Sequence, residues 1–143
     1  MIIPDINLLV YAYDESSPFH KKAKAWLSSL LNGREEVGFA LVSVLGFIRI
    51  SSNPKIFENP LSPPAACEIA SSWLASPQAA MLAPTNKHLP ILQGLLEKSH
   101  ASSGLTTDAH IAAIAIEHHG IVHSNDEDFR RFENLRWVNP IRS

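Results

Sequence analysis

Residues 108–123 read DAHIAAIAIEHHGIVH and join a helix pattern to a strand pattern. Apolar residues from Ile111 to Ile116 occupy every side of the expected helix, which indicates that this helix is largely buried. The two histidines followed by Gly120 are typical of a helix C-terminus. The apolar segment 121–123 that comes next is too short to be stable outside a sheet. The stretch therefore predicts a buried helix that leads into a strand of a covered sheet.

The rest of the chain alternates between the same two patterns. Segment 6–13 is so apolar that periodicity leaves strand and helix equally open. Serine, threonine and proline are favoured at helix starts, which we therefore expect at Ser16-Ser17-Pro18, Ser43, Ser62-Pro63-Pro64, Thr85 and Thr106-Thr107. Strands are expected at residues 1–4, 37–42, 79–82, 121–123 and 137–138. This order predicts one α/β domain over residues 1–143, with a mostly parallel central sheet flanked by helices in three layers.

Composition and charge limit the classes of function. The chain has 143 residues, of which 45% are hydrophobic and 18% charged, as in a folded soluble domain. Its net charge of −2 does not by itself indicate nucleic-acid binding, and we interpret the basic clusters at residues 21–24 and 130–136 as solvated faces. No apolar stretch has the roughly 18 residues of a membrane span, and no basic leader precedes the first apolar run. The single cysteine, Cys67, is expected to be half-buried on a helix, and we expect a cytoplasmic location.

Acidic residues stand where elements are expected to begin or end: Asp5, Asp108, Asp126 and Asp128. In parallel sheets ligands bind beyond the carboxyl ends of the strands, and Asp5 and Asp126 both follow an expected strand. Carboxylates held close together repel one another unless a cation lies among them. Oxygen ligands of this kind suit Mg²⁺ or Mn²⁺. The pattern therefore predicts a metal-dependent enzyme, if these segments pack as neighbours.

Each acidic segment also has a plainer interpretation when it is taken alone. Asp5 and Asp108 suit the first turn of a helix, where the dipole favours an ionised carboxylate, and residues 124–129 suit a polar turn. The spacing of Asp5 and Asn7 predicts a hydrogen bond from Asn7 to the Asp5 side chain or to a nearby backbone group.

Two other kinds of site are excluded by spacing. A helical zinc site would show two histidines four residues apart with a glutamate between them, and His110, His118 and His119 do not. A phosphotransfer aspartate would need a second acid two residues after Asp5, where Asn7 stands, and the chain has no glycine-rich phosphate loop.

Several segments together resemble a known family. They are the opening Asp5-Ile6-Asn7, the segment LGFIRISSNP at residues 45–54, the late Thr106-Thr107-Asp108, and HGIVHSNDEDF at residues 119–129. In order and spacing they resemble PIN-domain nucleases, most closely the VapC-type toxins of prokaryotic toxin–antitoxin pairs. The resemblance runs from residue 3 to residue 129 and implies a Mg²⁺- or Mn²⁺-dependent endoribonuclease.

The same resemblance assigns roles to residues of this chain. It implies metal-binding, catalytic acids at Asp5, Asp108 and Asp126, with Asp128 as a further ligand, and supporting polar residues at Asn7 and Ser124. It also implies an RNA substrate and a VapB-type antitoxin that neutralises the nuclease. The reaction expected is an in-line attack on phosphorus by a metal-activated water.

Further contacts are expected from the chemistry of individual side chains. Arg49 is a candidate for holding the RNA backbone, because a guanidinium matches phosphate in two-point contact, although a structural ion pair suits it equally. The helix faces with Phe19, Trp26 and Trp73 suit either the core or a contact with the antitoxin or a second copy in a homodimer. Many members of the family that this chain resembles carry a glutamate on the second helix, where this chain has Gly46. The alternative is therefore a catalytically silent PIN-like module that binds RNA or protein.

Overall fold

A parallel sheet forms the middle layer of the molecule. The structure, a computed structural model, describes residues 1–100 and 102–142. The five strands run parallel in the order β3-β2-β1-β4-β5. Their bounds are β1 Ile2–Pro4, β2 Val37–Ala40, β3 Ala79–Leu82, β4 Ile121–His123 and β5 Arg136–Val138.

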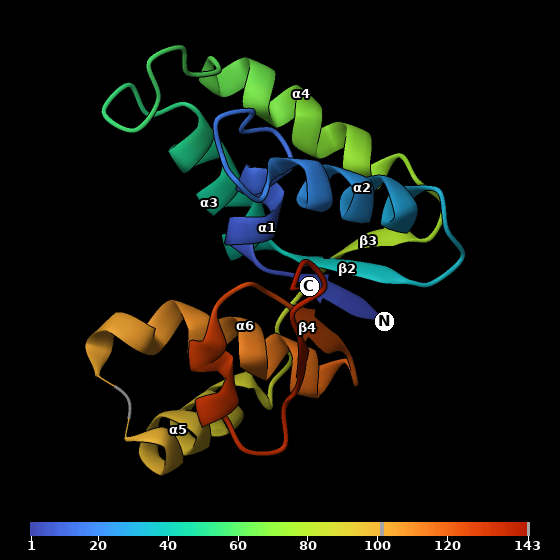
Figure 1. The fold of residues 1–143 in the computed structure, drawn as a ribbon. Helices are drawn as coiled ribbons and strands as arrows, with labels where there is room; N and C mark the ends of the chain where they lie inside the picture. Colours follow the sequence, from blue (N-terminus) through green and yellow to red (C-terminus); the bar gives the residue numbers. More distant parts are fainter. Residues whose placement is uncertain (101, 143) are drawn as a thin grey trace.

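Helices cover both faces of this sheet, as Figure 1 shows. One face carries α1 (Ile6–Tyr11), α2 (His20–Leu31), α3 (Leu41–Ser51) and α4 (Pro63–Leu74). The opposite face carries α5 (His88–Ser99) and α6 (Thr106–Glu117). Two short 3-10 turns, η1 (Ser103–Leu105) and η2 (Glu127–Arg131), complete the described elements. The predicted three-layer α/β fold is confirmed. Within residues 1–100 and 102–142, no helix has the length and apolarity needed to cross a membrane.

Each face of the sheet has its own apolar core. Beneath α1 to α4, the fully buried Trp73 stacks on Phe39 and meets Phe47 edge-on, with ring centroids 5.4 and 4.7 Å apart. Beneath α5 and α6, Ile111 and Ile114 pack in a cluster with Ile3 of β1. The prediction that the helix around residues 111–116 is buried is confirmed. Of the three aromatic residues left open by the sequence, Trp73 belongs to the core.

Gly120 allows α6 to return closely onto β1. A Cβ atom at this position would lie 2.5 Å from Cδ1 of Ile3, which is closer than packed atoms approach. The left-handed backbone conformation typical of a helix C-terminus is adopted by His119, with a φ of 55°, and not by Gly120. Gly120 is therefore required for close packing against β1, whereas the helix-end conformation falls to the residue before it.

Several expected element boundaries are wrong by a few residues. Residues 6–11 form a helix, which settles the open choice between strand and helix. The second helix begins at His20, because Pro18 lies in a turn before it and Phe19 is its N-cap. The strand expected to reach residue 42 ends at Ala40, whose partner Leu82 is the last residue of β3. The cap expected at Ser62, by contrast, is present, since its Oγ accepts a hydrogen bond from the Ala65 N–H.

Two of the residues expected at helix starts have other roles. Ser43 lies inside α3, and within residues 1–100 and 102–142 its buried Oγ has no hydrogen-bond partner. The N-cap of α5 is Lys87, whose N–H donates to Oγ1 of Thr85 at 3.1 Å. The amide and the hydroxyl of Thr85 both donate to Oε1 of Glu117, at 2.7 and 2.6 Å. Thr85 therefore ties the start of α5 to the end of α6. Cys67, expected to be half-buried, is exposed on α4.

Candidate metal centre

The ends of β1 and β4 bring two distant polar residues together. These strands pair in register, with Pro4 opposite His123. The next residue on each strand is polar, Asp5 after β1 and Ser124 after β4. The Asp5 N–H continues the ladder by donating to the carbonyl oxygen of His123 at 2.9 Å. The site thus lies beyond the carboxyl ends of parallel strands, where the sequence predicted it.

Ser124 connects three parts of this site. Its hydroxyl is fully buried and donates to Oδ2 of Asp5 at 2.6 Å. The same oxygen accepts hydrogen bonds from Nδ2 of Asn7 at 3.2 Å and from the Asp126 N–H at 2.9 Å. A serine hydroxyl offers one donor and two acceptor positions, so its capacity is fully used. Of the two partners expected for Asn7, the backbone group is found, since its Oδ1 accepts the Asn125 N–H at 3.4 Å, whereas its Nδ2 donates to Ser124 and not to the Asp5 carboxylate.

Asp5 combines a structural role with a position in the site. It is the N-cap of α1, where its Oδ1 accepts the Ile6 N–H at 2.7 Å, and it is only 5% exposed. Burial raises the pKa of Asp5 above its ordinary value, although the hydrogen bonds from Ser124 and Ile6 oppose the increase. The charge of Asp126 raises this pKa further. Asp5 therefore caps α1, and its position beside the other acids is compatible with a role in the candidate site.

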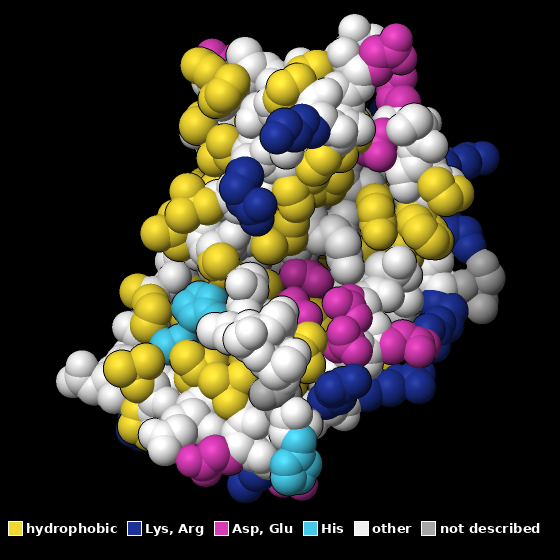
Figure 2. Space-filling model, turned by 90° about the vertical axis from the view of Figure 1, so that its left-hand side faces the viewer, with side chains coloured by type: hydrophobic (Ala, Val, Ile, Leu, Met, Phe, Trp, Pro, Cys, Tyr) yellow, Lys and Arg dark blue, Asp and Glu magenta, His cyan; other side chains and the backbone are white. Residues whose placement is uncertain are grey.

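Three carboxylates form a tighter group beside Asp5. Asp108, Asp126 and Asp128 each present an oxygen, and these oxygens all lie within 4.8 Å of one another. Asp108 comes from the first turn of α6, and the other two come from the loop after β4 and from η2. In the described residues Asp5 is not a member of this group, but its charge acts on Asp108. Figure 2 shows acidic side chains gathered on one face of the molecule, next to Lys and Arg side chains.

The close approach of these acids changes the protonation of Asp108. Burial raises its pKa to about 7, and the charges of Asp5, Asp126 and Asp128 contribute to the increase. The expectation that the helix N-terminus keeps this carboxylate fully ionised is therefore wrong for the protein alone. Burial and carboxylate repulsion outweigh the dipole there. A divalent cation among these oxygens would offset the repulsion that raises the pKa.

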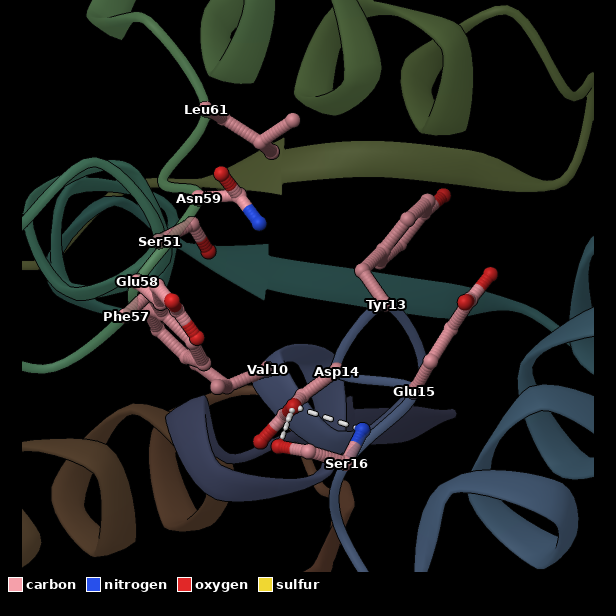
Figure 3. Close-up of a pocket in the computed structure, with 10 residues that line it drawn as sticks. All are labelled: Val10, Tyr13, Asp14, Glu15, Ser16, Ser51, Phe57, Glu58, Asn59 and Leu61. Carbon is pink, nitrogen blue, oxygen red and sulfur yellow. Dashed lines mark hydrogen bonds between the residues drawn. The ribbon is translucent and has the colours of Figure 1, made fainter.

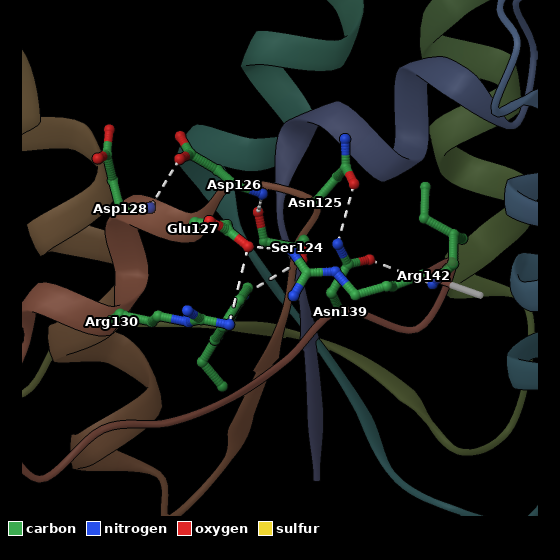
Figure 4. A network of polar contacts seen from close by, with 10 residues as sticks. Ser124, Asn125, Asp126, Glu127, Asp128, Arg130, Asn139 and Arg142 are labelled. Atoms are coloured by element: carbon green, nitrogen blue, oxygen red, sulfur yellow. Dashed lines mark hydrogen bonds and ion pairs between the residues drawn. The ribbon is translucent and has the colours of Figure 1, made fainter.

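The 124–128 loop holds its acids through local hydrogen bonds and arginine contacts, which Figure 4 shows. Oδ1 of Asp126 accepts the Asp128 N–H at 2.9 Å. Oδ1 of Asp128 lies 3.6 Å from Nε of Arg131, three residues later. Asp128 therefore lies close both to a cation, Arg131, and to two acids, Asp108 and Asp126.

Glu127, between the two aspartates, belongs to a separate set of contacts. Its Oε1 bonds Arg142 and lies 3.7 Å from Nη2 of Arg130. The hydrogen bond and charge of Arg142 hold the pKa of Glu127 below its ordinary value. The arginines at 130 and 131, expected to form a solvated face, lie close to acids of this loop. Their spacing of three residues from Glu127 and Asp128 is the sequence signal for these contacts.

Gly46 and Arg49 lie on α3. Gly46 is buried, and a Cβ there would lie 2.6 Å from Cδ1 and 2.9 Å from Cγ1 of Ile6, the residue after Asp5. Ile6 thus fills the space that a side chain at position 46 would need. Arg49 is exposed in the last turn of α3. Its expected contact with RNA stays a prediction.

Oxygen-rich donors of this kind match the preferences of Mg²⁺ and Mn²⁺. The group supplies carboxylate oxygens from two chain segments held by helix α6 and by the Ser124 hydrogen bonds. Of the acids predicted from the sequence, Asp108, Asp126 and Asp128 come together, and Asp5 lies close enough for its charge to raise the pKa of Asp108. The residues therefore fit a hard divalent cation.

Comparison with known proteins gives a consistent result. A family model described as PIN domain matches residues 2–135. The chain is 40% identical over 142 residues to "Ribonuclease VapC33" of Mycobacterium tuberculosis, an alignment that covers 99% of each chain. It is 41% identical over 140 residues to "Ribonuclease VapC37" of the same organism, covering 98% of this chain and 97% of the relative.

Among solved structures, a chain of VapBC2 from Rickettsia felis, bound to a DNA fragment from their promoter, is similar in fold. The TM-score is 0.68 at 19% identity, over 96% of this chain and 98% of that one. At this identity the likeness shows the fold. The family match and the two full-length relatives show more: the chain belongs to the PIN-domain family, among its VapC-type members.

Proposed function

We propose that the protein is a Mg²⁺- or Mn²⁺-dependent endoribonuclease that acts as the toxin of a toxin–antitoxin pair. The observation that carries this proposal is the group of Asp108, Asp126 and Asp128, with oxygens within 4.8 Å of one another. The relatives named as ribonucleases support the choice of RNA as substrate. Phosphodiester hydrolysis is a reaction for which an acidic metal centre is well suited.

The three grouped aspartates would hold the cation, with Asp5 as a further ligand or a charge beside it. A bound divalent ion supplies Lewis-acid polarisation of a phosphoryl oxygen and lowers the pKa of a bound water. Asp128 has a cationic neighbour, Arg131, and its side chain is 45% exposed. We assign it the role of orienting the attacking water for in-line attack.

The remaining residues of the site act by positioning. Ser124 fixes the Asp5 carboxylate through Oδ2, while the Ile6 N–H fixes Oδ1. Asn7 holds Ser124 in turn and accepts the Asn125 N–H at 3.4 Å, which keeps the 124–128 loop against α1. Oriented carboxylates bind metal better than free ones, because less order is lost on binding.

Two partners follow from the same proposal. The fold neighbour is a VapBC complex, which supports a VapB-type antitoxin as the inhibitor of this chain. A homodimer is supported by Leu41 and Leu45, which lie one turn apart on α3 and are 53% and 55% exposed. We propose that a second copy covers them. A shift to monomer in the Leu45→Glu variant, measured by light scattering, tests this contact.

The experiment that tests the nuclease is cleavage of total RNA by purified protein freed of antitoxin. Cleavage is expected with Mg²⁺ or Mn²⁺, and is expected to stop on chelation and in the Asp5→Asn and Asp108→Asn variants. Intact RNA under these conditions, with no metal binding by calorimetry, would instead support the silent binding module. Gly46 favours that second function, because Ile6 fills the position where the family resemblance leads us to expect a glutamate.

A further inference from the structure

A groove runs between helix α2 and the C-terminal segment, beside the 124–128 loop. It consists of two adjoining clefts of about 310 and 450 Å³ that share Lys22, Ile141 and Arg142. The first cleft is also lined by Phe19, Asn125 and Asn139, and the second by Trp26. We call the two together the α2 groove.

The groove adjoins the candidate metal centre through the backbone. Asn125 lines its first cleft, and the next residue is Asp126 of the carboxylate group. Figure 4 shows Asn125, Asn139 and Arg142 on one side of the loop, with the Asp126 and Asp128 side chains on the other. A chain that crosses this loop would therefore pass directly from the groove to the acids.

The lining of the groove combines positive charge with aromatic rings. Phe19, Lys22 and Trp26 lie three and four residues apart, so they share one side of α2 over about 10 Å. Arg142, whose guanidinium also bonds Glu127, lines the groove from the C-terminal segment. In the described part of the chain, the residues that line the groove include no acid. Single-stranded nucleic acids bind in basic grooves that offer aromatic faces to successive bases.

Several of the lining side chains are held in place by the fold. The Trp26 indole N–H donates to Nδ1 of His123 at 3.0 Å, and the Phe19 ring lies 5.0 Å from that of Tyr11. Nδ2 of Asn139 donates to Oδ1 of Asn125 at 2.9 Å, which turns the Asn125 amide nitrogen away from Asn139. A groove with fixed rings and fixed amides loses little side-chain entropy when it binds a ligand.

A second cleft of the molecule has the opposite character. The cleft in Figure 3, between the end of α1 and the loop after α3, has a volume of about 390 Å³ and is lined by Asp14, Glu15 and Glu58. Three acidic side chains repel a phosphate backbone. Charge therefore favours the α2 groove for RNA, although the two clefts are similar in size.

We propose that the α2 groove binds single-stranded RNA on one side of the bond that is cut. Phe19 and Trp26 would stack bases, Lys22 and Arg142 would contact phosphates, and Asn125 would donate to a base or phosphate next to the metal centre. This inference rests on the proposed nuclease function and adds to it the path of the substrate.

The test measures binding without cleavage. A fluorescein-labelled, unstructured RNA of mixed sequence is titrated with the full chain in EDTA, and fluorescence anisotropy is followed at several salt concentrations. For Lys22→Gln, the slope of log K against log salt is expected to decrease by about 0.7, the value for one lost contact to a single strand. For Phe19→Leu, binding is expected to weaken roughly five- to tenfold through lost stacking.

Lys24→Gln is the matched control, because Lys24 is on the same helix but lines a different cleft. Its affinity and salt slope are expected to equal those of the wild type. Equal slopes for Lys22→Gln and Lys24→Gln would overturn the proposal. Unchanged RNA binding combined with lost antitoxin binding in Lys22→Gln would also overturn it and assign the groove to the antitoxin. Groove-dependent binding by a chain that cuts no RNA with Mn²⁺ would support the groove and contradict only the nuclease.

Discussion

Ser124 donates a 2.6 Å hydrogen bond to Asp5 across 119 positions of the chain, and both residues are buried. The bond joins the ends of two neighbouring strands and fixes a carboxylate at the edge of an acidic group. Because the same hydroxyl oxygen accepts from Asn7 and from the Asp126 N–H, one side chain orders the parts of the site that come from β1, α1 and the 124–128 loop.

Ser124→Ala removes this connection. It leaves the Oδ2 of Asp5 and two donors without a partner, so the free energy of unfolding is expected to decrease by about 2 to 3 kcal/mol. RNA cleavage is expected to decrease as well, since Asp5 loses its orientation. Urea unfolding and the cleavage rate are the measurements. Ser71→Ala, at an exposed position on α4, is the control and is expected to change stability by no more than about 0.5 kcal/mol. Equal effects of the two substitutions would contradict the role given to Ser124.

Asp108 makes stability depend on pH in the absence of metal. Its pKa is raised from an ordinary value of 3.8 to about 7, so the folded state binds more protons than the unfolded state between these values. The free energy of unfolding is therefore expected to decrease as pH rises from about 4 to 7. Above that range, the stabilisation that protonated Asp108 contributes is expected to be fully lost. The measurement is the Tm in EDTA as a function of pH.

Asp108→Asn carries no titrating group at this position. In EDTA its Tm is expected to exceed that of the wild type increasingly between about pH 5 and pH 8. Added Mg²⁺ is expected to stabilise the wild type at the upper end of this range and to have much less effect on the variant. Parallel Tm curves for the two proteins at all pH values would show that Asp108 is not the titrating group.

Gly46 and Gly94 provide a matched pair of helical glycines. A Cβ at Gly46 would meet Ile6 at 2.6 Å, whereas nothing lies within 4 Å of a Cβ at Gly94. Gly46→Ala is therefore expected to destabilise the fold by about 1 to 3 kcal/mol through overpacking. Gly94→Ala is expected to stabilise it by about 0.5 to 1 kcal/mol through helix propensity. The double variant Ile6→Val and Gly46→Ala should recover part of the loss. Two stabilising glycine replacements in urea unfolding would refute the account of Ile6.

Glu117 connects α5 to α6 away from the metal centre. Its side chain is 1% exposed and accepts from Thr85, while its Oε2 lies 2.5 Å from Nδ1 of His88. Although burial raises the pKa of Glu117, the hydrogen bonds from Thr85 and His88 lower it more, so it lies below its ordinary value of 4.5. The stabilisation is expected above that pH and is lost as pH falls through the lowered folded-state pKa.

Glu117→Gln is expected to destabilise the protein by about 2 to 4 kcal/mol near neutral pH, because His88 loses its charged partner inside the fold. The difference from the wild type is expected to shrink in acid. Urea unfolding at neutral and acidic pH measures both effects. Glu97→Gln, an exposed change on α5, is the control, and a loss as large as that of Glu117→Gln would remove the case for this contact.

Much of the fold was predictable because its signals are local. The apolar run at residues 111–116 identified the buried helix, and the cap at Ser62 with its prolines identified the start of α4. The positions of Asp5 and Asp126 after strands predicted where the candidate site lies, since parallel strands end at one edge of the sheet. The boundary was wrong at Ser43, where the pairing of β2 with β3 ends at Ala40 and α3 begins two residues before the expected cap.

The remaining features depend on contacts between residues far apart in the chain. Thr85 and Glu117 are 32 positions apart, and His88 reaches His110 at 2.8 Å over 22 positions. No periodicity or spacing indicates such pairs. The same holds for the pKa of Asp108, which depends on carboxylates from two other segments, and for the α2 groove, which forms only when the C-terminal segment packs beside α2.

The most direct measurement of the central claim is a Mn²⁺ titration of the purified chain, followed by calorimetry and by the electron paramagnetic resonance of free Mn²⁺. We expect saturable binding by the wild type, and at least tenfold weaker binding by Asp126→Asn, since a lost ligand typically costs more than about 1.4 kcal/mol. Glu127→Gln, one position along the same loop but paired with Arg142, is expected to bind like the wild type. Equal Mn²⁺ affinity in all three proteins would contradict the assignment of a metal centre to these aspartates.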